Sequence, residues 1–293
     1  MASDKNRTQA LFDKLQRFSR LSTGAKPEAV HQLRTTVRRI ETLLATASPT
    51  PARKERKFLK QLKRLRRRAG KVRDFDVQIE ALGSLRLESS SRDRVRVMAF
   101  LEQARARQEK KLLGAVEAEV EDGLPKRLKL IARHVQQESP KPQARVTQDR
   151  FLTAALDKFA AVANEHGALT ESNLHDFRMD CKRVRYLAEM AGEGDKVAAV
   201  IQQLKRIQDA VGTWHDWVTL TATAESVLSR AGQVPLLSAL RADTRSKFLE
   251  ALRISADAKR VLLEMHEAEQ TARKPIAMAA PAAEAPAARA ATA

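Results

Sequence analysis

Two segments of the sequence repeat positively charged side chains at intervals of three and four residues. The first contributes His31, Arg34 and Arg38, and the second contributes His175, Arg178, Lys182 and Arg185. Each interval is close to one turn of an α-helix, so each set would form a stripe along one side of a helix. Arginine can grip two phosphate oxygens with its planar guanidinium, lysine acts as a mobile point charge, and histidine can donate a hydrogen bond to phosphate. Such stripes suit an anion whose charge repeats along its length.

The same segments place apolar residues beside the charged ones. The apolar stripes are Val30, Leu33, Val37, Ile40 and Leu44 in the first segment and Leu174, Phe177, Cys181 and Val184 in the second. Neighbouring positions lie about 100° apart around a helix, so each cationic stripe runs beside the buried stripe rather than opposite it. This placement predicts side chains that face a groove where helices or bundles meet.

The two segments belong to an internal repeat. HQLRTTVRRIETLL, starting at His31, aligns with HDFRMDCKRVRYLA, starting at His175, at an offset of 144 residues. LKRLRRRAGKVRDFDV, starting at Leu62, aligns with LKRIQDAVGTWHDWV, starting at Leu204, at an offset of 142. Nearly equal offsets in two separate matches predict two homologous helical halves, each with the same pair of basic helices.

Positive charge is densest between residues 51 and 73, where twelve lysines and arginines accompany a single acid, Glu55. Like charges three or four residues apart weaken a helix by roughly 0.2–0.5 kcal/mol per pair. The segment therefore needs counter-anions, as does the whole chain, whose formal net charge is +18. This excess indicates polyanionic partners or an anionic surface.

The remaining pattern predicts an all-α protein. Hydrophobic residues make up 43% of the chain, and it has only ten glycines and ten prolines. Apolar residues at helical spacing predict helices over 7–21, 27–47, 52–70, 73–83, 91–121, 124–138, 146–166, 171–191, 195–211, 215–230 and 236–268. We expect a first helical half at 1–138, a linker at 139–144, a second half at 145–268 and a disordered Ala/Pro-rich tail at 269–293.

Several classes of protein are disfavoured. A single cysteine, Cys181, excludes an intrachain disulfide and a cysteine-cluster metal site. The first residues contain no apolar stretch typical of a secretory signal, and no window approaches the roughly 20 apolar residues of a membrane span. We therefore expect a cytoplasmic protein.

The segments around His31, Leu62, His175 and Leu204 resemble the repeated signatures of the CHAD family, the conserved histidine α-helical domain. The resemblance covers about residues 8 to 268 and includes the run Arg183, Arg185 and Tyr186 and the elements near Asp74 and Asp209. It implies two four-helix bundles related by pseudo-twofold symmetry, with a basic groove or pore between them. It also implies binding of inorganic polyphosphate and location at polyphosphate granules.

We predict a non-enzymatic polyphosphate-binding protein that needs no cofactor or metal. No phosphate-binding glycine loop or catalytic triad pattern is present, and neither repeated histidine has a second ligand three or four residues later. The predicted contacts are His31, Arg34, Arg38, Arg39, Lys60, Lys63, Arg64, Arg67, Arg73, His175, Arg178, Lys182, Arg183, Arg185, Tyr186, Lys205, Arg206 and His215. Asp74 and Asp216 are expected to cap helices or orient arginines rather than act as catalytic acids.

Three alternatives stay open at this point. A nucleic-acid-binding protein would use the same charges, although the chain has only twelve aromatic residues with which to stack bases. A polyphosphate-processing enzyme would need a site that no linear motif reveals. A helical scaffold would use the Ala/Pro tail to dock a partner or a granule surface.

Overall fold

The computed structural model describes residues 2–18, 25–47, 52–85, 92–137, 144–228 and 234–273, and these residues form helices without any strand. The helices are α1 (Ala2–Phe18), α2 (Pro27–Ala47), α3 (Arg53–Ser84), α4 (Arg92–Glu121), α5 (Leu124–Gln137), α6 (Ala144–His166), α7 (Leu174–Glu189), α8 (Asp195–Leu228) and α9 (Pro235–Arg273). The predicted all-α class is confirmed. No described helix combines the length and apolar character that crossing a membrane requires.

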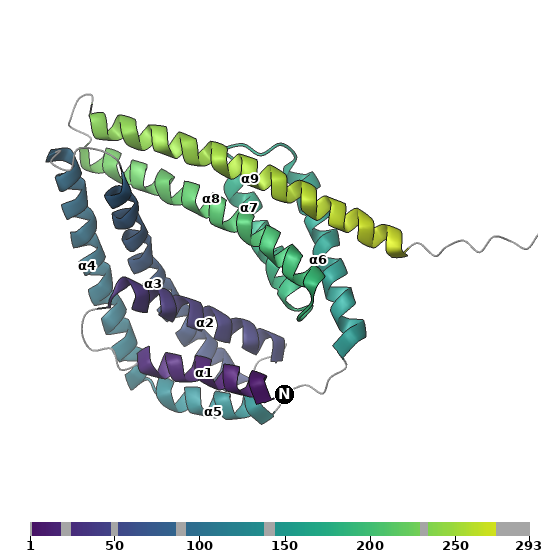
Figure 1. Ribbon diagram of the computed structural model, residues 1–293. Coiled ribbons are helices and arrows are strands. Elements are labelled where there is room, and N and C mark those ends of the chain that lie inside the picture. Colours follow the sequence, from purple (N-terminus) through teal and green to yellow (C-terminus); the bar gives the residue numbers. More distant parts are fainter. Residues whose placement is uncertain are drawn as a thin grey trace, which may run out of the picture.

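Three hydrophobic clusters hold the helices together (Figure 1). One joins α1, α2 and α5 to the first part of α3 and the last part of α4. A second joins α6 and α7 to the first part of α8 and the later part of α9. The third lies where the two long helix pairs meet, and packs Leu82 and Leu101 against Trp217, Leu220 and Leu240. Each half therefore has its own core, and a shared core joins them at one end.

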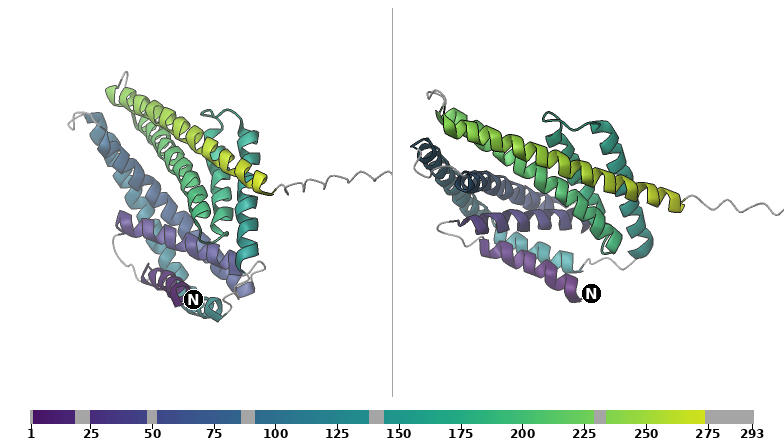
Figure 2. Two further views of the ribbon diagram at one scale, coloured as in Figure 1. Left: turned by 45° about the vertical axis from the view of Figure 1, so that its right-hand side comes forward. Right: turned by 45° about the horizontal axis from the view of Figure 1, so that its top comes forward.

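The long helices make two pairs, α3 with α4 and α8 with α9, whose connecting ends lie close together in every view (Figures 1 and 2). In each half a shorter helix packs on the pair, α2 on α3 and α7 on α8. This order matches the predicted duplication, although the symmetry of the halves stays a prediction. The packing places α2 and α7, which carry the two cationic stripes, on the sides of the halves that approach one another.

Both basic helices continue through positions where a break was expected. The ranges 52–70 and 73–83 form the single helix α3, and α8 likewise covers Gly212 without interruption. A glycine within a helix costs about 1 kcal/mol relative to alanine. In α3 this cost is offset by the burial of Ala69 and Val72, which lie on either side of Gly70 and face the core.

The expected start of the tail at residue 269 is wrong, because α9 continues to Arg273. The additional turn packs against α6, where Gln270 Nε2 donates a hydrogen bond to Asp157 Oδ1 at 2.8 Å and Thr153 donates to Glu269. The predicted linker ends one residue earlier than expected, since α6 begins at Ala144. Residues 139–143 and 274–293 lie outside the described part of the chain.

Candidate functional site

The two cationic stripes come together between α2 and α7. Arg38 on α2 lies within electrostatic reach of Arg34 on its own helix, of Arg66 on α3 and of Arg185 on α7. Burial lowers the pKa of the Arg38 guanidinium, and these three like charges lower it further. Positive charge from both halves is therefore concentrated in one partly buried place.

Lys182 on α7 lies within the same concentration of positive charge. Burial is the larger cause that lowers the pKa of its ammonium to about 8, and nearby arginines of both stripes add to the effect. Those arginines are Arg34 and Arg38 from the first half and Arg178 and Arg185 from the second. The stripes predicted on separate helices thus form one cationic cluster in the fold.

A pocket of 260 Å³ opens within this cluster and is lined by residues of both halves. The first half supplies Arg38, Glu41 and Arg66, and the second supplies Met179, Lys182, Arg183 and Tyr186. The guanidinium of Arg185 lies 5.4 Å from the centre of the Tyr186 ring. An anion in this pocket would meet fixed positive charge on two sides. We call these pocket residues, with Arg34, Arg178 and Arg185, the inter-half groove.

Glu41 and Arg66 complete the groove and were missed as site residues. The two side chains form an ion pair with a distance of 2.7 Å between Arg66 Nε and Glu41 Oε2. Burial raises the pKa of Glu41, while Arg66, Arg38 and Lys63 oppose that rise. A signal was present in the sequence, because Glu41 stands one helical turn after Arg38 as an isolated acid on a cationic stripe.

Arg178 is held in place by contact with α8. Its Nε donates a hydrogen bond of 3.1 Å to the backbone oxygen of Gln208. The guanidinium lies so close to Gly212 that a Cβ atom there would be 3.2 Å from Arg178 Nη2. Gly212 therefore provides the space that Arg178 occupies. At the repeated position in α3, a Cβ on Gly70 would meet no atom within 4 Å.

Two carboxylates lie beside the arginines. Burial raises the pKa of Asp216, and the neighbouring negative charge of Asp74 raises it further, while Arg178, Arg73 and Arg34 lower it. Burial likewise raises the pKa of Asp74, and the positive charge of Arg34 opposes that rise. This arrangement favours the expected role of the two acids in orienting arginines.

The two repeated histidines, His31 and His175, lie in different surroundings. His175 packs against His215 with ring centres 4.6 Å apart. Burial lowers the pKa of His215, followed by the effects of His175 and Arg178, so this ring stays neutral to lower pH than an exposed histidine. His175 Nδ1 is buried and has no hydrogen-bond partner within the described residues. His31, by contrast, is exposed.

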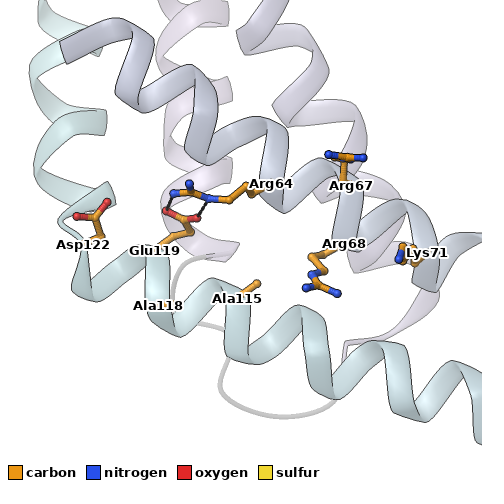
Figure 3. A pocket seen from close by; sticks show the side chains of 8 residues that line it. All are labelled: Arg64, Arg67, Arg68, Lys71, Ala115, Ala118, Glu119 and Asp122. Atoms are coloured by element: carbon orange, nitrogen blue, oxygen red, sulfur yellow. Dashed lines mark hydrogen bonds and ion pairs between the residues drawn. The ribbon is translucent and has the colours of Figure 1, made fainter. Parts of the chain in front are cut away.

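Not every predicted contact faces the inter-half groove. Arg64 and Arg67 line a pocket between α3 and α4 instead, where Arg64 Nη2 donates to Glu119 Oε2 at 2.9 Å (Figure 3). Five other predicted contacts are exposed, and no described interaction links them to the groove arginines. They are His31, Arg39, Lys60, Lys205 and Arg206. Positions 64 and 66 are rotated by about 200° around the helix axis. Which of the two arginines faces the groove therefore depends on how α3 packs.

A sequence model of the CHAD domain matches residues 7–225. Among solved structures, the crystal structure of the CHAD domain from the plant Ricinus communis is similar, with a TM-score of 0.55 over 91% of this chain and 85% of that chain. The two sequences are 17% identical, so this likeness concerns the fold. A search of curated proteins found no match.

Proposed function

This chain belongs to the CHAD domain family, and we propose that it binds inorganic polyphosphate in the inter-half groove without altering it chemically. The observation that carries the proposal is the convergence of Arg38 and Lys182, from different halves, on one pocket. The family resemblance supplies the identity of the anion. The geometry of the groove supports its basic residues as the positions at which the phosphates would be held.

Binding would relieve an unfavourable feature of the unliganded groove. Partly buried cations that lie close together repel one another and have lost part of their hydration. Phosphate oxygens would replace the lost water and screen the repulsion through charge-assisted hydrogen bonds. Each contact would also release condensed counterions from the polyphosphate chain, which makes the affinity sensitive to salt.

The composition of the groove favours polyphosphate over nucleic acid. Proteins that hold single-stranded nucleic acid without sequence preference combine a basic groove with aromatic rings on which bases stack. Tyr186 is the aromatic residue among those that line the pocket, and it already lies beside the Arg185 guanidinium. A chain of phosphates has no bases and needs no such rings.

The test is a titration of the full chain with long-chain polyphosphate, compared with the double variant Arg38→Ala, Arg178→Ala. We expect the variant to bind more than roughly tenfold less tightly, since a hydrogen bond to a charged group contributes about 1.5–3 kcal/mol. The matched control is Arg253→Ala, Arg260→Ala, which removes two exposed arginines of α9 that pair with acids on their own helix. Equal affinity of the two double variants would refute the proposal.

Two further measurements separate the alternatives. Displacement of polyphosphate by RNA at equal phosphate concentration would favour a nucleic-acid-binding protein. Shortening of polyphosphate on a gel, after incubation with the protein and a divalent metal ion, would refute the non-enzymatic part of the proposal.

We also propose that binding locates the protein at polyphosphate granules. The double variant Arg38→Ala, Arg178→Ala should then lose this location in cells, while the Arg253→Ala, Arg260→Ala control should keep it. Granule association of both variants would refute a role for the groove in localisation.

A further inference from the structure

A second basic pocket lies between α3 and α4, away from the inter-half groove (Figure 3). Its volume is 610 Å³, more than twice that of the groove pocket. The cationic wall consists of Arg64, Arg67, Arg68 and Lys71 from α3. Small side chains of α4, at Ala115 and Ala118, form the opposite wall and leave room beside the charges. We call this feature the α3/α4 pocket.

The α3/α4 pocket is separated from the groove by the body of α3. Arg66 lines the groove pocket, whereas Arg68 lines the α3/α4 pocket. Residues two positions apart on a helix are rotated by about 200° around its axis. Side chains that leave a helix on such different sides cannot grip the same phosphate. An anion bound in one pocket would therefore leave the other available.

The acidic residues of the α3/α4 pocket are already paired. Glu119 receives both hydrogen bonds of the Arg64 guanidinium. Asp122 accepts from Lys57 Nζ at 2.8 Å and lies 3.0 Å from Arg127 Nη2. These pairs neutralise the end of the pocket that Arg64 occupies.

The other end of the α3/α4 pocket keeps its positive charge. Within the part of the chain that the structure describes, Arg67, Arg68 and Lys71 form no ion pair with an acid. All three line the pocket, and they leave α3 within about 6 Å along its axis, at a rise of 1.5 Å per residue. Two guanidinium groups and one ammonium match the oxygens and charge of a short run of phosphates.

We propose that the α3/α4 pocket is a second anion site, which takes a compact oligophosphate group of two or three phosphates. The charges at the Arg64 end are already paired, so that end offers no free cation to a longer anion and a short group fits better than a long chain. Inorganic oligophosphate and the triphosphate of a nucleotide share this chemistry. The inference stands apart from the function proposed for the groove, because it uses different residues on another side of α3.

The first experiment titrates the full chain by calorimetry with tripolyphosphate and, separately, with ATP. The double variant Arg68→Ala, Lys71→Ala should bind roughly tenfold less tightly, while the groove variant Arg38→Ala, Arg178→Ala should keep this site. Binding of both ligands would show that the phosphate run alone is recognised, and binding of one would identify the source. No binding of either ligand would overturn the proposal, as would a loss confined to the groove variant.

A second experiment tests the space rather than the charge. Ala118→Leu would fill the wall opposite the arginines without changing any charge, and leucine is nearly as favourable in a helix as alanine. We expect this variant to lose binding of the short anion and to keep its helical circular dichroism. Ala106→Leu, at another exposed position of α4, is the control and should bind normally. Undiminished binding by Ala118→Leu would show that the anion only associates with surface charge, and the pocket assignment would fail.

Discussion

Replacing Gly212 by alanine tests whether the fold positions Arg178. The added Cβ would lie 3.2 Å from Arg178 Nη2, closer than most Cβ contacts in proteins, and 3.5 Å from Nε, an ordinary contact distance. The guanidinium cannot move freely, because its Nε donates to the Gln208 backbone oxygen on the same stretch of α8. The substitution therefore presses on the side chain that brings the second half's charge into the groove.

The size of the effect follows from two opposing contributions. Glycine to alanine within a helix stabilises the folded state by about 0.5–1 kcal/mol when nothing stands in the way. Displacing Arg178 weakens a hydrogen bond from a charged donor, which contributes about 1.5–3 kcal/mol when intact. We expect Gly212→Ala to leave the free energy of unfolding unchanged or to lower it by about 1 kcal/mol. Affinity for polyphosphate should fall roughly threefold to tenfold.

The repeat provides a matched control for this experiment. Gly70 occupies the corresponding position of α3, and its added Cβ would meet no atom within 4 Å. Gly70→Ala should therefore raise the free energy of unfolding by about 0.5–1 kcal/mol and leave polyphosphate binding unchanged. Urea unfolding and calorimetric titration of the two variants measure both quantities. If both are stabilised equally and both bind as the parent does, Arg178 is not held by its contact with α8.

Three other changes probe the groove and the packing of α4 on α3. Glu41→Gln removes the acid that pairs with Arg66, so polyphosphate should bind more tightly and with a steeper salt dependence in titrations at several salt concentrations. The pKa of Lys182 is lowered to about 8 from 10.5, so the unfolded chain holds this proton to higher pH than the folded protein. The affinity for polyphosphate should therefore fall as the pH rises through 8, while the free energy of unfolding should rise between pH 8 and 10.5. Lys182→Arg should abolish both trends. If they persist in this variant, Lys182 is not their source. Arg105 Nε lies 2.7 Å from Asp76 Oδ1, and Arg105→Met would leave this buried carboxylate without its partner. The variant should lower the free energy of unfolding, measured in urea, by about 3 kcal/mol or more. A loss below about 1 kcal/mol would show that the pair is not structurally important.

The sequence was sufficient for the features that depend on one helix at a time. The spacing of apolar residues predicted the all-α class and the buried faces, because positions along a helix have fixed angles around its axis. Val37, Ile40, Phe177 and Cys181 are indeed buried, and Arg38 and Lys182 lie beside them at the boundary of the core. The sequence also predicted that each stripe faces a neighbouring element, because a charge beside the core is directed toward one; that the two stripes face each other depends on the packing of α2 and α7.

Only the tertiary structure decided how the charges of α3 divide. Basic residues surround most of this helix, so its sequence alone does not distinguish the side that faces α2 and α7 from the side that faces α4. Packing places Arg66 beside Glu41 in the groove and turns Arg64 toward Glu119. The same is true of Gly212 and Gly70, which occupy corresponding places in the repeat but differ in what lies over them. Contacts between helices depend on the relative placement of side chains far apart in the chain, and no local pattern encodes that placement.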